Sequence, residues 1–260
     1  MHTPSRHVWL VCLFATAAVL GAMYFCLNRP HTLMDAIAKG DVRAVEKILQ
    51  KEGLETGSSA PAYLADTITW LPYSYSRRDY TPTDKQIARR NEITYNMVKL
   101  LVEYGADIDQ PSKSFSDRTP LRAAFFWRMP DVVNYLIEQG ASVNIFYGDN
   151  LYSPLMYAAS DGYTVTVQLL LERNAKETIN HARNDGNTAL HLASDSEICK
   201  LLLDNGADPT IRNNKGQTPL EQAQEYNLKD IVAVLEKYMN ADRNQNSEAE
   251  PEIVPEEQGD

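Results

Sequence analysis

The sequence predicts an all-α fold, a stack of about six helix–turn–helix repeats that follows one long apolar helix. The first observation is a helix-start motif, Thr or Ser followed by Pro or Ala and then Leu, which recurs at residues 119, 153, 188 and 218. The second is the Leu- and Val-rich segment that follows each motif at helical spacing. The third is an apolar run without charges at residues 8–27.

The unit at residues 184–220 shows the pattern most completely. Its Asp-Gly pair predicts a tight turn, and Thr188 is expected to cap a first helix that starts directly after it. Three leucines at residues 201–203 form the buried part of a second helix, and Gly206 supplies the left-handed residue that ends it. In the next unit Pro219 takes the first helical position, where a missing N–H group costs nothing.

The helix-start motifs are separated by 34, 35 and 30 residues. We attribute the short last step to a trimmed turn between the two helices of its unit, at Asp195 and Ser196. Ahead of the motifs, residues 33–53 predict two short helices with a turn at residues 39–41. A first repeat without the motif is expected, because terminal repeats cap a stack and are often atypical.

The second repeat is interrupted by an insertion. Residues 61–71 predict its first helix and residues 97–105 its second. Between them, residues 72–90 contain Pro, Tyr and Arg without helical periodicity. This predicts a long loop, of a kind that is usually functional or disordered.

These units resemble the ankyrin repeat, which spans about 33 residues, combines a turn with two helices and begins with T-P-L-H-x-A. The resemblance covers residues 31–240 and implies a solenoid of these repeats. The sequence departs from the family pattern at Phe125, where a small alanine is usual, and at three positions where the histidine is replaced, Arg122, Met156 and Glu221. For His191, which keeps the histidine, the resemblance implies a structural role in the turn.

Residues 8–27 are 20 residues without a charge, the length that spans a bilayer as a helix. The apolar core of a signal peptide is shorter, about 7–15 residues, so we predict an uncleaved anchor at residues 1–30, with a cleaved signal peptide as the alternative. The Lys and Arg residues after the span would by themselves place the repeats in the cytoplasm. A short tail before a first span is instead usual for a bacterial signal anchor, and we expect a single-pass inner-membrane protein with its repeats in the periplasm.

The net charge of −10 argues against nucleic-acid binding, which needs a basic face. Seven acidic residues lie within residues 241–260, a polar stretch that predicts a disordered acidic tail. Cys199 is the single cysteine after the apolar run, so no disulfide is expected within the repeats. We expect the chain to be a monomer.

The sequence contains no pattern of catalytic or metal-binding residues. Its histidines lack the spacing of a metal site, and neither a G-x-S-x-G motif nor a phosphate-binding loop occurs. Cys199 has no pattern of charged neighbours that would activate a thiol. We therefore predict a protein that is not an enzyme and that binds no metal or cofactor.

Six aromatic residues are candidates for binding a protein partner. In ankyrin repeats the hairpin tips and the first helices line a concave surface, and aromatic side chains are typical anchors of interfaces. The six are Phe126, Trp127, Phe146, Tyr147, Tyr152 and Tyr157. Residues 125–127 cannot all be buried on a short helix, so at least one should be exposed. The alternative for each residue is that it fills a gap between repeats.

Arg77 and Arg78 in the insertion are a second candidate for partner binding. Together with nearby tyrosines they give this segment a basic, aromatic character within an acidic chain. Such a loop would suit an acidic cleft of a partner or the anionic surface of a membrane. The alternative is a loop that is merely solvated.

Two functions compete for this set of features. In the first, a membrane-tethered module binds one enzyme or toxin and inhibits it; the chain looks like the membrane-anchored bacterial ankyrin proteins, some of which act as immunity proteins against secreted effectors. In the second, the chain is a membrane scaffold, or an assembly or protective factor for a resident enzyme. A neighbouring toxin gene would favour the first function, and co-purification with a membrane enzyme would favour the second.

Overall fold

The computed structural model describes residues 33–51, 64–74, 83–112 and 118–247, and their contacts fall into two compact units, residues 1–142 and 143–260. The predicted all-α class is confirmed, because every regular element in these residues is a helix apart from one isolated β-bridge. No helix in the described ranges has both the length and the apolar character needed to cross a membrane. The predicted span at residues 8–27 lies outside those ranges.

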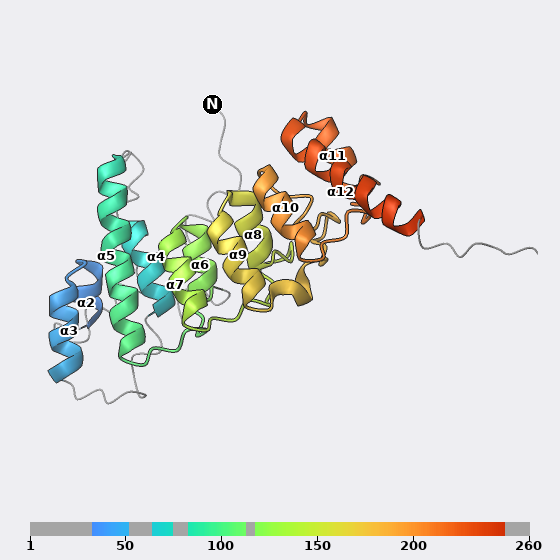
Figure 1. Ribbon diagram of the computed structural model, residues 1–260. Coiled ribbons are helices and arrows are strands. Elements are labelled where there is room, and N and C mark those ends of the chain that lie inside the picture. Colours follow the sequence, from blue (N-terminus) through green and yellow to red (C-terminus); the bar gives the residue numbers. More distant parts are fainter. Residues whose placement is uncertain (1–32, 52–63, 75–82, 113–117, 248–260) are drawn as a thin grey trace, which may run out of the picture. The chain divides into compact units, whose positions relative to one another are not determined.

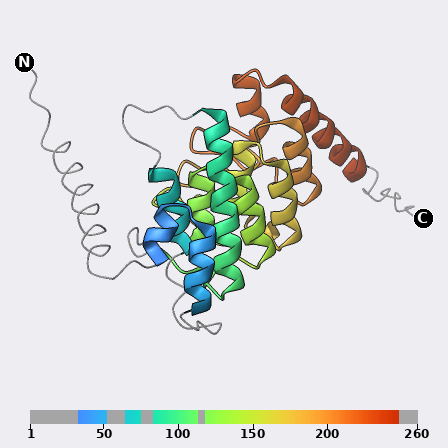
Figure 2. The ribbon, with the colours of Figure 1, turned by 90° about the vertical axis from the view of Figure 1, so that its left-hand side faces the viewer.

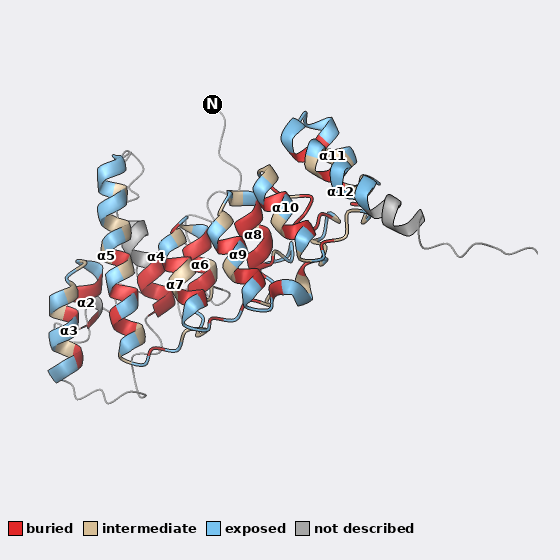
Figure 3. Ribbon diagram, in the orientation of Figure 1, coloured by how far each residue is buried: buried red, intermediate tan, exposed pale blue. Residues whose placement is uncertain are grey.

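The described helices of the first unit form two layers (Figure 1). One layer contains α2 (Leu33–Ala38), α4 (Leu64–Ser74) and α6 (Pro120–Phe126), and the other contains α3 (Val42–Lys51), α5 (Asp84–Glu103) and α7 (Pro130–Glu138). Both layers turn apolar faces toward each other, which Figure 3 shows as buried. The buried residues include Val45, Ile68, Leu101, Leu121 and Leu136.

In the second unit the second helices of successive repeats pack against one another (Figure 1). α9 (Thr164–Glu172), α10 (Ser196–Asp204) and α12 (Lys229–Ser247) pack one after another, while α8 (Pro154–Asp161) packs on α9 and α11 (Pro219–Glu225) packs on α12. A 3₁₀ turn, η2 (Ala175–Thr178), follows α9. The core residues of this unit include Leu155, Leu170, Leu202 and Leu235, all fully buried.

Side-chain caps explain where α6, α8 and α11 begin. Thr119, Ser153 and Thr218 each accept a hydrogen bond from the backbone N–H three residues on, at 3.3, 3.2 and 3.2 Å, and each is followed by Pro. Glu221, at a position where the family usually has histidine, accepts a hydrogen bond from the Thr218 backbone N–H at 2.9 Å and completes a capping box. Gly206 has the predicted left-handed conformation, with a φ of 95°.

The first helix predicted directly after Thr188 is absent. Residues 189–192 form a single hydrogen-bonded turn instead. Asp195, the next cap, follows Thr188 by seven positions, whereas the cap at Tyr163 follows Ser153 by ten positions. The unit is therefore shorter in its first helix. The predicted trimming of the turn at Asp195 and Ser196 was wrong.

Two helices are longer than predicted. α5 starts at Asp84, so residues 84–90 of the predicted insertion are helical, and α5 extends past its neighbours in Figure 2. Thr83 begins α5 with a capping box. α12 continues through residues 241–247, which belong to the predicted disordered tail. Both extensions are rich in polar residues, so apolar periodicity could not reveal them.

Candidate functional site

The end of α6 presents the most exposed aromatic ring among the predicted site residues. Phe125 is 2% exposed and Phe126 is 57% exposed, because neighbouring residues on a helix point in different directions. The Phe126 ring meets Trp127 edge to face, with ring centroids 5.3 Å apart, and the Arg118 guanidinium lies 4.5 Å from its centroid. Phe126 is thus exposed yet fixed in place, as predicted for at least one residue of this run.

Trp127 is less exposed than Phe126. It caps the C-terminus of α6 and is half-buried. Its indole N–H is buried and meets no hydrogen-bond acceptor among the described residues. Trp127 therefore supports the Phe126 ring, and Phe126 supplies the outer contact surface.

Tyr147 was predicted to be an exposed contact residue, but its side chain is only 5% exposed. Its backbone forms the isolated bridge with Tyr152, through hydrogen bonds of 2.8 and 3.2 Å in the two directions. Its ring lies against Tyr157, with centroids 6.1 Å apart. Tyr147 thus fills the hairpin of its own repeat.

Tyr152 and Tyr157 remain at the surface as a half-buried pair, with ring centroids 4.8 Å apart. Arg183 lies over the Tyr152 ring, 4.9 Å from its centroid, and donates a hydrogen bond to the Tyr152 hydroxyl. The same guanidinium binds Asp185, with its Nε 2.6 Å from Oδ1. This hydrogen-bonded ion pair raises the pKa of Arg183 and lowers the pKa of Asp185.

Arg183 is the residue that sequence reasoning missed at this surface. In the sequence Asp185 is marked only as part of a turn signal, and no motif marks Arg183. The spacing of an arginine two residues before the Asp-Gly turn could have drawn attention to the pair. The contact with Tyr152 joins residues 31 positions apart, and no local pattern predicts it.

Phe146 forms a separate contact on the second unit. Its ring is 42% exposed and stacks on His181, with centroids 3.9 Å apart and an angle of 31° between the planes. His181 Nε2 is buried without a hydrogen-bond partner in the described residues. The two remaining predicted site residues, Arg77 and Arg78, lie outside the described ranges.

His191 has the structural role that the resemblance implied. Its Nδ1 accepts a hydrogen bond from the Thr188 backbone N–H at 3.2 Å, and its Nε2 lies 3.1 Å from the Gln217 carbonyl. Because Nδ1 accepts, Nε2 carries the proton, and its N–H group donates a hydrogen bond to that carbonyl. Burial lowers the pKa of His191. The side chain links the hairpins of two successive repeats.

The described residues include a buried thiol and surfaces rich in aromatic and charged side chains. Burial raises the pKa of Cys199 to about 12, which leaves its thiol protonated and unreactive at neutral pH. Over the ranges that the structure describes, no group of three His, Cys, Asp or Glu side chains could hold a metal ion. What these surfaces offer a ligand is aromatic rings, guanidinium groups and carboxylates.

The chain belongs to the ankyrin repeat family. The model "Ankyrin repeats (3 copies)" matches residues 33–147 and 155–247, which together make up most of the chain. Ankyrin repeats are protein-interaction modules, and the family is generally non-catalytic.

Several known proteins are similar to this chain in sequence. A putative ankyrin repeat protein of fowlpox virus is 43% identical over 115 residues, 42% of this chain and 33% of that protein. The mitochondrial disaggregase of Bos taurus is 31% identical over 207 residues, 77% of this chain and 29% of that protein. A putative ankyrin repeat protein of Rickettsia felis is 37% identical over 118 residues, 41% of this chain and half of that protein. The chain thus spans about a third of the length of the first two relatives.

One solved structure covers nearly the whole repeat region. A chain from the complex of the predatory endopeptidase of Bdellovibrio bacteriovorus with its immunity protein is 25% identical, with a TM-score of 0.58. The match covers 81% of this chain and 99% of that chain. That chain is similar over almost its full length, unlike the curated relatives.

Proposed function

We propose that this chain binds one partner protein, an enzyme such as an endopeptidase, and inhibits it in the manner of an immunity protein. The observation that carries the proposal is the likeness, over 99% of the matched chain, to a chain from an endopeptidase–immunity protein complex. Family membership supports the binding of a partner protein, since ankyrin repeats are protein-interaction modules. The inhibition of that partner goes beyond what family membership supports.

The exposed aromatic residues are the proposed contacts with that partner. Phe126 offers a large apolar ring held by Trp127 and Arg118, which limits the entropy lost on binding. On the second unit the proposed contacts are Phe146, Tyr152 and Tyr157. Large exposed aromatic rings favour aggregation unless a partner covers them, which supports a role in recognition. Arg77 and Arg78 are proposed to contribute from the insertion.

We further propose that residues 8–27 tether the chain, as a monomer, to the bacterial inner membrane with the repeats in the periplasm. The support is the length of this run, 20 residues without a charge. Removal of residues 1–30 should transfer the protein from the membrane fraction to the soluble fraction. A truncated protein that still sediments with membranes would contradict the tether.

The test of inhibition starts with affinity capture of the partner by the full chain. The captured enzyme is then assayed alone and with increasing amounts of the chain. We expect activity to fall to near zero at one chain per enzyme, and the Phe126→Ala chain to need a higher concentration for the same effect. A partner that keeps its full activity when bound would replace inhibition by the scaffold or protective function.

A further inference from the structure

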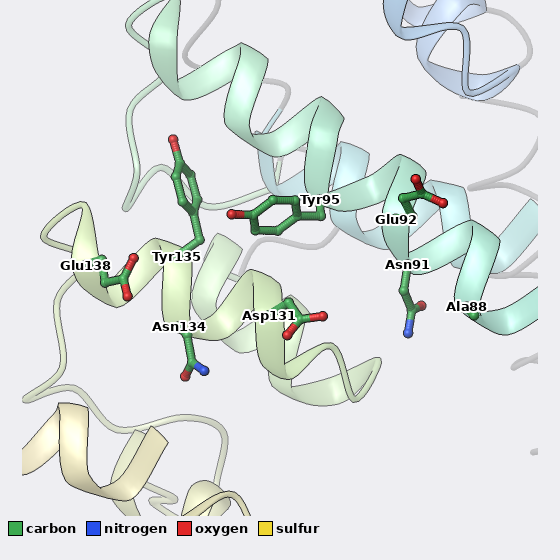
Figure 4. A pocket seen from close by; sticks show the side chains of 8 residues that line it. All are labelled: Ala88, Asn91, Glu92, Tyr95, Asp131, Asn134, Tyr135 and Glu138. Carbon is green, nitrogen blue, oxygen red and sulfur yellow. The ribbon is translucent and has the colours of Figure 1, made fainter. Parts of the chain in front are cut away.

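A groove runs along the surface of the first unit between α5 and α7 (Figure 4). It measures about 600 Å³. Tyr95 from α5 and Tyr135 from α7 meet there edge to face, with ring centroids 5.7 Å apart and an angle of 73° between the planes. Both rings are half-buried. The groove therefore offers fixed aromatic surface to a ligand, in the layer of second helices rather than in the layer of α6 that carries Phe126.

The polar lining of this groove is acidic. Glu92 from α5 and Asp131 and Glu138 from α7 are exposed along it, and no Lys, Arg or His is among the lining residues. Burial, followed by the negative charge of Glu103, raises the pKa of Tyr135, consistent with a negative potential around the groove. A cationic ligand matches this surface in charge.

The carboxylates are arranged for an extended ligand rather than for a single ion. Among the described residues no three acidic or other metal-binding side chains come together as a metal site. Asp131 and Glu138 lie seven residues apart on α7, a separation of about 10 Å along a helix. A ligand that contacts both must carry positive charges about two helical turns apart.

The spacing of the lining residues favours a helical ligand. Ala88, Glu92 and Tyr95 follow one another at steps of four and three along α5, and Asp131, Tyr135 and Glu138 do the same along α7. Each set lies on one face of its helix, so the groove has two parallel walls of equal length. A third helix laid between them presents its own residues at the same steps. An extended strand turns every second residue away.

We propose that the α5–α7 groove binds a basic helix of a partner protein, with Lys or Arg at positions i, i+4 and i+7. The aliphatic stems of these residues pack on Tyr95 and Tyr135 while their charged ends reach Glu92, Asp131 and Glu138. This site is independent of the aromatic surface around Phe126 and of the proposed inhibition.

The test uses a labelled alanine-based helical peptide with arginines at i, i+4 and i+7, titrated against the full chain by fluorescence anisotropy. A second peptide has the same composition with its arginines spread around the helix. We expect the first peptide to bind at least about tenfold more tightly than the second. The triple variant Glu92→Gln, Asp131→Asn, Glu138→Gln should weaken binding of the first peptide at least about tenfold.

A matched control removes three exposed carboxylates from the second helices of the other unit, through Glu172→Gln, Glu197→Gln and Glu236→Gln. Both triple variants change the net charge equally, so equal losses of affinity would reveal attraction to overall charge and overturn the proposal. Ala88→Trp fills the groove without a change of charge and should also abolish binding; unchanged binding would place the peptide elsewhere. A wild-type dimer that the groove variant loses would assign the groove to a second copy and likewise overturn the proposal.

Discussion

The hairpins of the second unit and the end of α6 use their side chains in opposite ways. Asn187, His191 and Asn213 are buried, and their polar groups bind one another or the neighbouring backbone. The Asn213 side chain donates a hydrogen bond to Asn187 Oδ1 at 3.0 Å and accepts hydrogen bonds from two backbone N–H groups at 3.0 Å each. Phe126 is more than half exposed, outside any such network. The first set of residues holds successive repeats together, whereas Phe126 is available to a partner.

This contrast assigns different effects to mutations in the two regions. Changes within the repeat scaffold should lower the free energy of unfolding and should weaken partner binding only through loss of folded protein. Changes at the exposed rings should weaken binding and leave unfolding almost unchanged.

The largest loss of stability is expected for Leu202→Ala. Leu202 is fully buried in α10, between α9 and α12. Removing its side chain leaves a cavity and should lower the free energy of unfolding by about 2–5 kcal/mol. Chemical denaturation measures this value. Since each repeat contacts only its neighbours, hydrogen exchange should accelerate most in the C-terminal repeats, and uniform acceleration along the chain would contradict the repeat assignment.

Gly186→Ala should be the next most damaging change, at about 2–4 kcal/mol. Gly186 has a φ of +80°, and an added Cβ would lie 2.6 Å from the Asn214 nitrogen and 2.8 Å from the Asn213 Cα. Gly216→Ala is the matched control, because its φ is +77° and no atom lies within 4 Å of the added Cβ. Denaturation curves should show a loss of about 1–2 kcal/mol for the control. Equal losses for the two variants would mean that the hairpins are not in close contact.

His191 should make stability depend on pH. Its pKa in the folded protein lies below the ordinary value of 6.5, so below about pH 6.5 the unfolded chain binds a proton that the folded protein does not. Stability should therefore fall as the pH drops from 7.5 to 5, by no more than about 1.4 kcal/mol per pH unit. His191→Ala should be less stable at pH 7.5 and should lose less on acidification. A variant with the wild-type pH profile would exclude His191 as the titrating group.

Much of the scaffold could be predicted from the sequence because its signals are local. Thr119, Ser153 and Thr218 cap helices as predicted, since a cap depends on residues within one turn. The missing helix after Thr188 was not predicted, because the motif is intact and only the distance to Asp195 shows that a full helix does not fit. The start of α5 was missed because an exposed polar helix has no apolar stripe to detect.

The candidate sites were less predictable, because exposure depends on contacts made across the fold. Phe126 is exposed, as expected for at least one residue of its run, because the burial of Phe125 turns it outward. Tyr147 was expected at the surface and is instead buried, because pairing with Tyr152 places its ring within the hairpin. The contact of Arg183 with Tyr152 and the groove between α5 and α7 arise from residues distant in the sequence.

The central claim, that exposed aromatic rings bind the partner, is tested most directly by Phe126→Ala. Its affinity for the captured partner is measured by isothermal titration calorimetry, and its free energy of unfolding is measured in parallel. Val165→Ala is the control, because Val165 is 70% exposed on α9 and belongs to neither proposed surface. We predict that Phe126→Ala weakens binding by at least about 2 kcal/mol, roughly thirtyfold, while unfolding changes by less than about 0.5 kcal/mol and Val165→Ala behaves as wild type. Wild-type affinity of Phe126→Ala, or an equal loss for Val165→Ala, would contradict the claim.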